Sequence, residues 1–449
     1  MTTPDTDSSA PAPAVPPPPA LDTAITSLGP CTYHSPLTFN SNIGDGIANF
    51  VTDDIRVRHQ VVLAANEPDD GISFEKAGPR AMLFFDPRRT RAAIVTCGGL
   101  CPGLNNVIRS VFLELHYRYG VREVLGIRYG YAGLTFKGVP PITLTPQLVE
   151  DIHRDGGSIL ASSRGKQDTS EIVDYLEQRG IQILICVGGD GTQHGTHEIA
   201  QEVLRRKLPI AVVGVPKTID NDIQFVRQTF GYYTAIESAR AILDGAHCEA
   251  RGAPNGIGLV KLMGRDSGFI AAGAAVASQE VNFVLIPEIP LKLDGPRGFL
   301  ATLHMRMSER RHALVVVAEG AGQDLLAQSG QVDKSGNKLH ADIGPYLRDR
   351  IKAYFKEKGV DINMKYIDPS YIIRSVPANS QDARLCDGFA RNAVHAAMAG
   401  KTDLIIGDWY SVFVHVPIAA AISSRKKVDT ESDLWASVIS TTGQPHAWE

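Results

Sequence analysis

Long apolar runs are missing from this sequence of 449 residues. None approaches the roughly 20 residues that a membrane-spanning helix needs. A basic tract is missing too, and with a net charge of −4 the composition indicates no nucleic-acid surface. An anionic ligand would therefore need locally placed Lys and Arg side chains. We expect a globular protein that binds neither membrane nor nucleic acid.

Cysteine is scarce. The six cysteines are spread along the chain, at Cys31, Cys97, Cys101, Cys186, Cys248 and Cys386. Cys97 and Cys101 are four residues apart, but no second cysteine pair or histidine cluster completes a zinc site. Free thiols in a reducing compartment are the better interpretation, so we expect a cytoplasmic protein.

Basic residues are absent from the first part of the chain, where Arg56 is the first Lys or Arg. Organelle transit peptides are rich in Arg, which argues against one here. Residues 1–30 are rich in Pro, Ala, Ser and Thr, and we expect a disordered tail. Residues 31–90 carry short apolar runs separated by Gly, Asp and Pro, and predict a small β-rich extension.

From Arg91 onward, short apolar runs alternate with amphipathic helical stretches. The expected strands cover residues 92–96, 181–187, 210–215, 257–262, 283–286, 314–317 and 404–406. The expected helices include residues 105–119, 196–206, 232–247, 344–358 and 382–399. Near-continuous apolar strands are typical of parallel sheets covered on both faces. The order predicts an α/β protein with two doubly wound, Rossmann-like three-layer domains.

The first motif follows the strand at 92–96 and opens a helix. It reads Thr96-Cys97-Gly98-Gly99-Leu100-Cys101-Pro102-Gly103-Leu104-Asn105-Asn106. It is neither a Walker A loop nor a Gly-x-Gly-x-x-Gly loop. Its glycines and the helix N-terminus suit a phosphate, although a tight turn explains the motif equally well.

The second motif is Gly188-Gly189-Asp190-Gly191-Thr192, again after a strand. A carboxylate beside glycines suits a Mg²⁺ ion bound to polyphosphate, because Mg²⁺ prefers one or two carboxylates plus phosphate oxygens. The alternative is an Asp that caps the next helix. This motif also occurs in NAD kinases and lipid kinases, so it indicates a nucleotide kinase more firmly than any acceptor.

The third motif, Pro216-Lys217-Thr218-Ile219-Asp220-Asn221-Asp222, follows the strand at 210–215. One carboxylate could accept the proton of an attacking hydroxyl, and the other could orient it or assist a metal. A turn rich in Asp and Asn is the alternative interpretation.

Three further segments carry candidate ligands for an anionic substrate. Arg265 stands in a strand-to-helix turn, where its guanidinium fork matches phosphate oxygens. Glu319 could bind sugar hydroxyls or cap a helix. Lys365 and Arg374 bracket a short extended run and could clamp a phosphate, although for this segment taken alone a solvated pair of cations is the better interpretation.

Taken together and in this order, the motifs over about residues 91–417 resemble ATP-dependent 6-phosphofructokinases of the phosphofructokinase A family. The extension and the third motif resemble the plant and protist branch, which is related to pyrophosphate-dependent enzymes. The resemblance implies transfer of the γ-phosphoryl group of ATP to the 1-hydroxyl of fructose 6-phosphate, with Mg²⁺ as cofactor. It also implies a homo-oligomer, with a tetramer favoured over a dimer.

The resemblance also implies roles for individual residues. Asp220 would be the base, assisted by Asp222 and by Arg164, and Asp190 would hold the metal. The ATP site would contain Gly99, Arg164, Gly165, Gly189, Asp190, Gly191 and Thr192. The sugar-phosphate site would contain Thr218, Ile219, Asp220, Met263, Gly264, Arg265, Glu319, Lys365, Tyr371, Ile372, Ile373 and Arg374. The ATP domain would span residues 91–231 and 375–449, and the sugar domain residues 232–374.

In the family that this chain resembles, two positions distinguish enzymes that use pyrophosphate from those that use ATP. Pyrophosphate enzymes carry an Asp where this chain has Gly191, paired with a Lys at the position of Lys217. Gly191 adds no charge and leaves room for an α-phosphate, so ATP is favoured and pyrophosphate is the alternative. A non-catalytic regulatory paralogue would need a lost carboxylate, yet Asp190, Asp220 and Asp222 are all present. An NAD-kinase-like enzyme would leave Met263 to Arg265 and Tyr371 to Arg374 unexplained.

Overall fold

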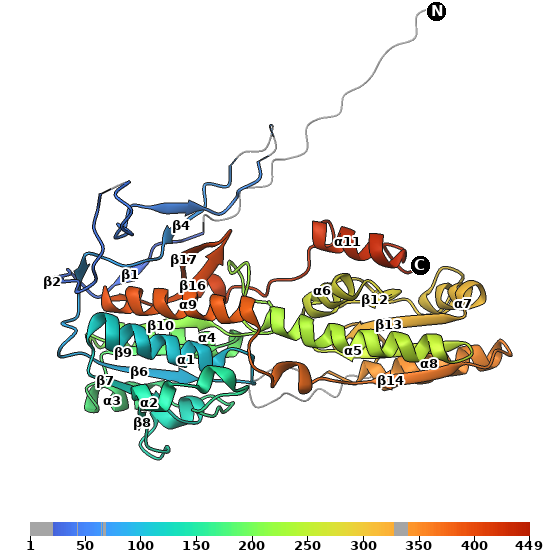
Figure 1. Cartoon of the computed structure of the whole chain (residues 1–449), viewed down its shortest axis with the longest axis horizontal. Coiled ribbons are helices and arrows are strands. Elements are labelled where there is room, and N and C mark those ends of the chain that lie inside the picture. Colours follow the sequence, from blue (N-terminus) through green and yellow to red (C-terminus); the bar gives the residue numbers. More distant parts are fainter. Residues whose placement is uncertain (1–20, 43, 64, 66–68, 327–339) are drawn as a thin grey trace, which may run out of the picture.

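The computed structural model describes residues 21–42, 44–63, 65, 69–326 and 340–449. Residues 1–20 of the expected disordered tail lie outside the described residues. Two sheets form the framework, one of nine strands and one of four, as the α/β prediction requires. Figure 1 shows them side by side, with helix α5 (Tyr232–Gly252) running from their boundary along the smaller sheet.

The nine-stranded sheet has the order β3-β4-β17-β16-β10-β9-β6-β7-β8. Its members are β3 Arg56–Arg58, β4 Ser73–Lys76, β6 Arg91–Thr96, β7 Glu123–Ile127, β8 Ile142–Thr143, β9 Ile183–Gly188, β10 Ala211–Pro216, β16 Leu404–Trp409 and β17 Val412–Pro417. The five strands from β16 to β7 are parallel, and antiparallel strands extend both edges. All six residues of β9 are buried, which explains its continuous apolar run.

The four-stranded sheet is parallel throughout, in the order β12-β13-β11-β14. Its members are β11 Gly256–Leu262, β12 Phe283–Leu285, β13 His312–Ala318 and β14 Asn363–Ile367. Ile257 and Leu259 of β11 face one core cluster, whereas Val260 and Leu262 face another. The alternation shows that this sheet, too, is covered on both faces.

Helices cover both faces of both sheets. The longer ones are α1 Leu104–Leu113, α3 Thr169–Gln178, α4 Asp190–Arg205, α6 Phe269–Ser278, α7 Phe299–Arg310, α8 Ile343–Glu357, α9 Ser380–Met398 and α11 Asp433–Thr442. Short ones are α2 Pro146–Val149, α10 Ile418–Ala421, the π-helix η1 Glu114–Tyr119, and the 3-10 turns η2 Gly130–Leu134, η3 Ile152–Arg154, η4 Gln323–Leu325 and η5 Ile372–Arg374. Apolar residues of α1 and α9 pack on one face of the large sheet and those of α3 and α4 on the other. Helices α5 and α6 cover one face of the small sheet, and α7 and α8 the other.

The N-terminal segment is joined to the large sheet more closely than the sequence suggested. Residues 26–27 form β1, which pairs with β15 (Lys401–Thr402), so part of the predicted tail is ordered on the fold. Strand β2 (Tyr33–His34) pairs with β5 (Met82–Leu83), while β3 and β4 extend the sheet. One of the short apolar runs on which the β-rich extension was predicted, residues 61–63, is exposed and lies outside any strand.

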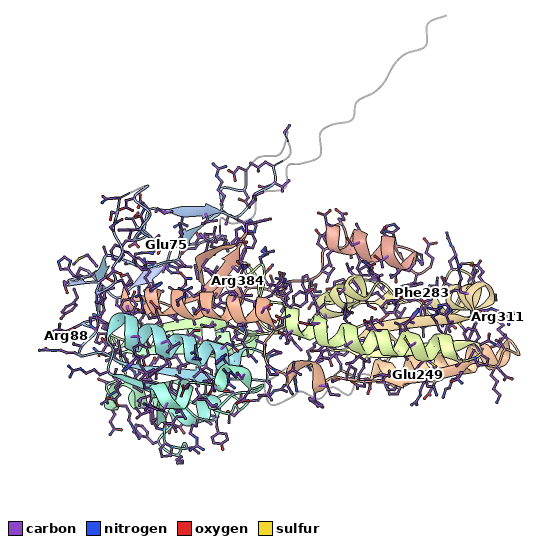
Figure 2. The ribbon with its side chains drawn as sticks, in the orientation of Figure 1. Glu75, Arg88, Glu249, Phe283, Arg311 and Arg384 are labelled. Atoms are coloured by element: carbon purple, nitrogen blue, oxygen red, sulfur yellow. The ribbon has the colours of Figure 1, made fainter. Side chains whose placement is uncertain are left out.

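A buried ion cluster fixes this segment. Glu75 of β4 is ion-paired through Oε1 to Arg80 and Lys401, at 2.6 and 2.8 Å, and is hydrogen-bonded through the same oxygen to His415, at 2.9 Å. Figure 2 shows Glu75 in the part of the molecule built on the large sheet, far from Phe283 of the small sheet. Such long-range pairs do not appear in local sequence patterns, which explains why the strand additions were missed.

The C-terminus crosses between the two parts. Strands β16 and β17 belong to the large sheet, but α11 packs against α6 and Trp448 lies among the core residues beside β12. Ring contacts join Trp448 to Phe283 and Phe299. The predicted second segment of the ATP domain, residues 375–449, therefore ends on the other domain.

Candidate active site

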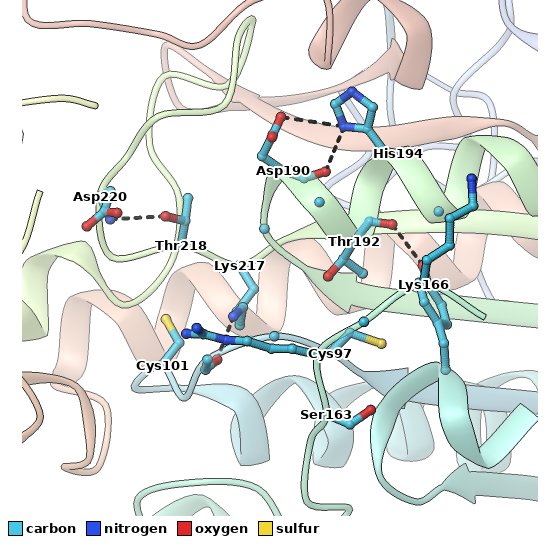
Figure 3. Close-up of a pocket in the computed structure, with 18 of the residues that line it drawn as sticks. Cys97, Cys101, Ser163, Lys166, Asp190, Thr192, His194, Lys217, Thr218 and Asp220 are labelled. Atoms are coloured by element: carbon cyan, nitrogen blue, oxygen red, sulfur yellow. Dashed lines mark hydrogen bonds and ion pairs between the residues drawn. The ribbon is translucent and has the colours of Figure 1, made fainter. Parts of the chain in front are cut away.

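A cavity of about 520 Å³ lies where the carboxyl ends of strands from both sheets meet (Figure 3). Residues that follow β6, β9, β10, β11 and β13 line it. Ligands of open α/β sheets bind at this edge. The volume falls within the about 300–1,000 Å³ that is usual for small-molecule sites.

Most of the predicted site residues line this cavity. They are Gly99, Arg164, Gly165, Gly189, Asp190, Gly191, Thr192, Lys217, Thr218, Ile219, Asp220, Asp222, Met263, Arg265, Glu319 and Arg374. The motifs are far apart in sequence, and they meet because each follows a strand of one of the two sheets.

Helix α4 begins at Asp190, directly after β9 and Gly189. We had expected the helix to start at residue 196, because the glycines and polar residues of its first turn carry no apolar periodicity. Backbone N–H groups of a first helical turn have no partner within the helix and give its end a positive dipole. The cavity thus has an anion-binding helix end, and a Cβ added to Gly191 there would meet no atom of the described residues within 4 Å.

Three cations gather around Gly99. A Cβ added to this glycine would lie 3.0 Å from Arg374 Nη1 and 3.3 Å from Arg164 Nη2. Lys217 is buried, and its Nζ donates a hydrogen bond of 2.6 Å to the Gly99 carbonyl oxygen. Burial lowers the pKa of both Lys217 and Arg374, and nearby Arg164 lowers both further. An anion bound here would offset this concentration of positive charge.

Two carboxylates stand in the loop after β10. Asp220 Oδ1 is buried without a hydrogen-bond partner in the described part of the chain. Burial, then Asp222 and Glu319, raise the pKa of Asp220 well above its ordinary value. Thr218 Oγ1 accepts a hydrogen bond from the Asp220 N–H and donates one of 3.0 Å to Asp222 Oδ1. A carboxylate whose pKa is raised in this way is suited to accept a proton near neutral pH.

Met263, Arg265 and Glu319 follow β11 and β13 of the small sheet and line the same cavity. Burial raises the pKa of Glu319, whereas Arg265 lowers it. Between Met263 and Arg265, Gly264 has a φ of +129°, and a Cβ there would lie 2.5 Å from the Ser267 carbonyl oxygen. Only glycine fits this turn without displacement of the backbone.

Five residues predicted for the sugar-phosphate site do not line the cavity: Gly264, in the turn between Met263 and Arg265, and four residues of the segment 365–374. Lys365 is exposed on β14, where it pairs with Gly258. Tyr371 and Ile372 are 72% and 66% exposed, and Ile373 is buried in the core. The segment is not one extended run: it is a strand followed by the short turn η5, which aims successive side chains in different directions. Arg374 alone of the predicted residues in 365–374 faces the cavity of this chain.

Known proteins match nearly the whole chain. A family model described as Phosphofructokinase matches residues 91–397. The ATP-dependent 6-phosphofructokinase of Borreliella burgdorferi is 48% identical over 95% of this chain and 97% of its own length. ATP-dependent 6-phosphofructokinase 7 of Arabidopsis thaliana is 44% identical over 92% of this chain and 85% of its own.

The chain belongs to the phosphofructokinase family. A solved pyrophosphate-dependent phosphofructokinase from Nitrosospira multiformis has a TM-score of 0.66 and covers 80% of this chain and 93% of its own, at 18% identity. That likeness confirms the two-domain α/β fold. It does not bear on the donor.

Arg425 is a charged residue of this site that the sequence analysis missed. Arg425 lines the cavity and is ion-paired to Asp190, Asp222 and Asp266. It stands beyond the last predicted strand, in Ser423-Ser424-Arg425-Lys426-Lys427, where the group of cations is the sole signal.

In the described residues, no group of three metal-ligating side chains is present and no helix could span a membrane.

Proposed function

We propose that this protein transfers the γ-phosphoryl group of ATP to the 1-hydroxyl of D-fructose 6-phosphate, which yields fructose 1,6-bisphosphate and ADP. The observation that carries the proposal is that one cavity is lined by Asp220, by the three cations around Gly99, and by Arg265 and Glu319. Relatives named ATP-dependent 6-phosphofructokinase support the same activity.

Asp220 is the base in this proposal. The attacking hydroxyl gives up its proton to the Asp220 carboxylate as its oxygen approaches the γ-phosphorus. Burial of this carboxylate raises its pKa, which strengthens it as a base at the pH where it is ionised. Asp222, held by the Thr218 hydroxyl, keeps the loop in place and adds negative charge beside the base.

The cations around Gly99 stabilise the transferring group. Phosphoryl transfer depends mainly on positioning and on neutralisation of the equatorial oxygens. Arg164, Arg374 and Lys217 gather at Gly99. In this proposal Arg164 neutralises the oxygens of the migrating phosphoryl group, and Lys217 holds the glycine loop through the Gly99 carbonyl.

The donor set fits a Mg²⁺ ion that arrives with ATP. Asp190 stands in the first turn of α4 and lines the cavity, and its carboxylate already contacts a positive charge, that of Arg425. One such carboxylate plus phosphate oxygens is the ligand set that Mg²⁺ prefers. Asp190 would hold the ion, which neutralises phosphate charge when bound.

ATP is preferred over pyrophosphate because of the open space beside Gly191. That space admits the α-phosphate of a nucleotide, and glycine adds no negative charge to repel it. Lys217 is engaged with the Gly99 carbonyl, so its presence does not by itself select pyrophosphate.

The rest of the proposal concerns organisation. The large-sheet domain binds ATP and the small-sheet domain binds the sugar phosphate. The protein acts in the cytoplasm as a homo-oligomer, with a tetramer favoured over a dimer. Purified protein with fructose 6-phosphate and either ATP or pyrophosphate tests the activity, and light scattering coupled to gel filtration tests the assembly.

A further inference from the structure

A segment near the C-terminus crosses the catalytic loop. This crossing segment, residues 423–428, links the large sheet to α11 on the small-sheet side. It runs antiparallel to the loop at an isolated bridge between Ile223 and Arg425. The Lys426 N–H donates a hydrogen bond of 2.9 Å to the Asp222 carbonyl oxygen. The segment is therefore held by the backbone of the loop that carries Asp220.

Arg425 extends from this segment to three carboxylates that follow three different strands. Its Nη2 lies 3.1 Å from Oδ2 of Asp190, which follows β9. Its Nη1 lies 3.7 Å from Oδ2 of Asp222, which follows β10, and is also paired with Asp266, which follows β11. One guanidinium thus joins donor-side, catalytic and sugar-side loops.

The crossing segment is also anchored by hydrogen bonds that do not involve these ion pairs. Lys426 Nζ donates a hydrogen bond of 2.6 Å to the Val226 carbonyl oxygen. The N–H groups of Val428 and Gly268 donate to the same oxygen, Glu288 Oε1, at 2.8 and 2.9 Å. Since Gly268 belongs to the turn that presents Arg265, this carboxylate fixes the segment to the sugar-side turn.

Charge explains why a cation is needed here. Asp190, Asp222 and Asp266 all contact one guanidinium, so their carboxylates lie close together, and without a cation between them their repulsion would separate the loops. The planar fork of Arg can hold several carboxylates at once, whereas Lys offers a single charged point. Arg425 is also ion-paired to the Asp190 carboxylate, so a divalent cation must compete with the guanidinium for this ligand.

We propose that Arg425 is a positioning residue, which holds the Asp190, Asp222 and Asp266 loops together before the donor binds and gives up Asp190 to the metal of the incoming donor. This inference rests on the proposed function for its kinetic consequence. Its structural consequence, competition between Arg425 and a divalent cation, does not depend on the identity of the substrates.

The test replaces Arg425 with Gln and measures Mn²⁺ binding to the full chain by electron paramagnetic resonance, without nucleotide or sugar. Without the competing guanidinium, the Asp190 carboxylate should bind Mn²⁺ about tenfold more tightly than in the wild type. In the fructose 6-phosphate assay kcat should fall about tenfold or more, because the loops are no longer held together. A purely structural role would weaken the fold without any gain in Mn²⁺ affinity.

Two further variants sharpen the result. Lys427→Gln removes the same charge at an exposed neighbouring position and should leave Mn²⁺ affinity and kcat as in the wild type. Arg425→Lys keeps the charge and should give intermediate values of both, which also serves if the Gln variant fails to fold. Wild-type Mn²⁺ affinity and kcat in the Arg425 variants would overturn the proposal. If the wild type itself shows no turnover, the proposed function fails while the Mn²⁺ comparison still decides the role of Arg425.

Discussion

Replacement of Asp220 by Asn should separate catalysis from stability. The change removes the carboxylate that would accept the hydroxyl proton and keeps its shape. Loss of a positioned base costs about 10²–10⁴ in rate, which corresponds to about 2.7–5.4 kcal/mol of activation free energy. Because Asp220 Oδ1 is buried without a partner in the described residues, loss of the charge should leave the melting temperature unchanged or higher. A coupled assay of ADP release gives kcat and KM, and calorimetry gives the melting temperature.

A second buried carboxylate provides the control. Asp382 Oδ1 also lacks a partner among the described residues, but its Oδ2 accepts hydrogen bonds of 2.7 and 2.6 Å from the N–H and hydroxyl of Thr234. Asp382→Asn should lower the free energy of unfolding by about 1 kcal/mol and leave kcat nearly unchanged. The reasoning about Asp220 is refuted if its Asn variant turns over at the wild-type rate, or if its activity returns at saturating substrate.

Three other outcomes are expected. Gly191→Asp should lower ATP turnover about tenfold or more by placing a charge beside the polyphosphate, whereas Gly191→Ala should be nearly neutral; equal effects would contradict the electrostatic reason. Because burial and neighbouring carboxylates raise the pKa of Asp220, kcat/KM should fall with decreasing pH through a pKa above the ordinary 3.8. Glu319→Gln removes a like charge near Asp220 and should therefore move this acid-side fall of kcat/KM to lower pH. A move to higher pH would contradict the electrostatic effect of Glu319 on Asp220. Glu75→Gln should lower the free energy of unfolding in urea by about 3–5 kcal/mol. Burial raises the pKa of Glu75, but the hydrogen bond from His415 and the neighbouring charges lower it to about 2. The ionised Glu75 carboxylate therefore stabilises the fold fully above pH 4.5, and this stabilisation is lost as the pH falls toward 2.

The central strands and the strand-end motifs could be predicted because both are local. Apolar runs fully buried in a parallel sheet have a distinct pattern, and residues that follow such strands must meet at one edge. Asp190, Asp220 and Arg265 were found in this way. The start of α4 was missed because its first turn consists of glycines and polar residues, which give no apolar signal.

Features that depend on contacts distant in sequence could not be predicted. Arg425 follows no strand-end motif, and its role depends on how the crossing segment returns over the loop of Asp222. Strands β3 and β4 join the sheet through pairs such as Glu75 with His415, which are 340 residues apart. Lys365 was expected at the site because it is close to Arg374 in sequence, but the strand directs it elsewhere.

The most direct test of the account is donor choice with purified full-length protein. Fructose 6-phosphate is supplied with Mg²⁺ and either ATP or pyrophosphate, and the product is identified by phosphorus NMR. We expect fructose 1,6-bisphosphate with ATP, and a rate with pyrophosphate at least about tenfold lower, since one unfavourable contact in the transition state is sufficient for that difference. Turnover with pyrophosphate alone would contradict the assignment of ATP from Gly191, and no turnover with either donor would contradict the proposed enzyme.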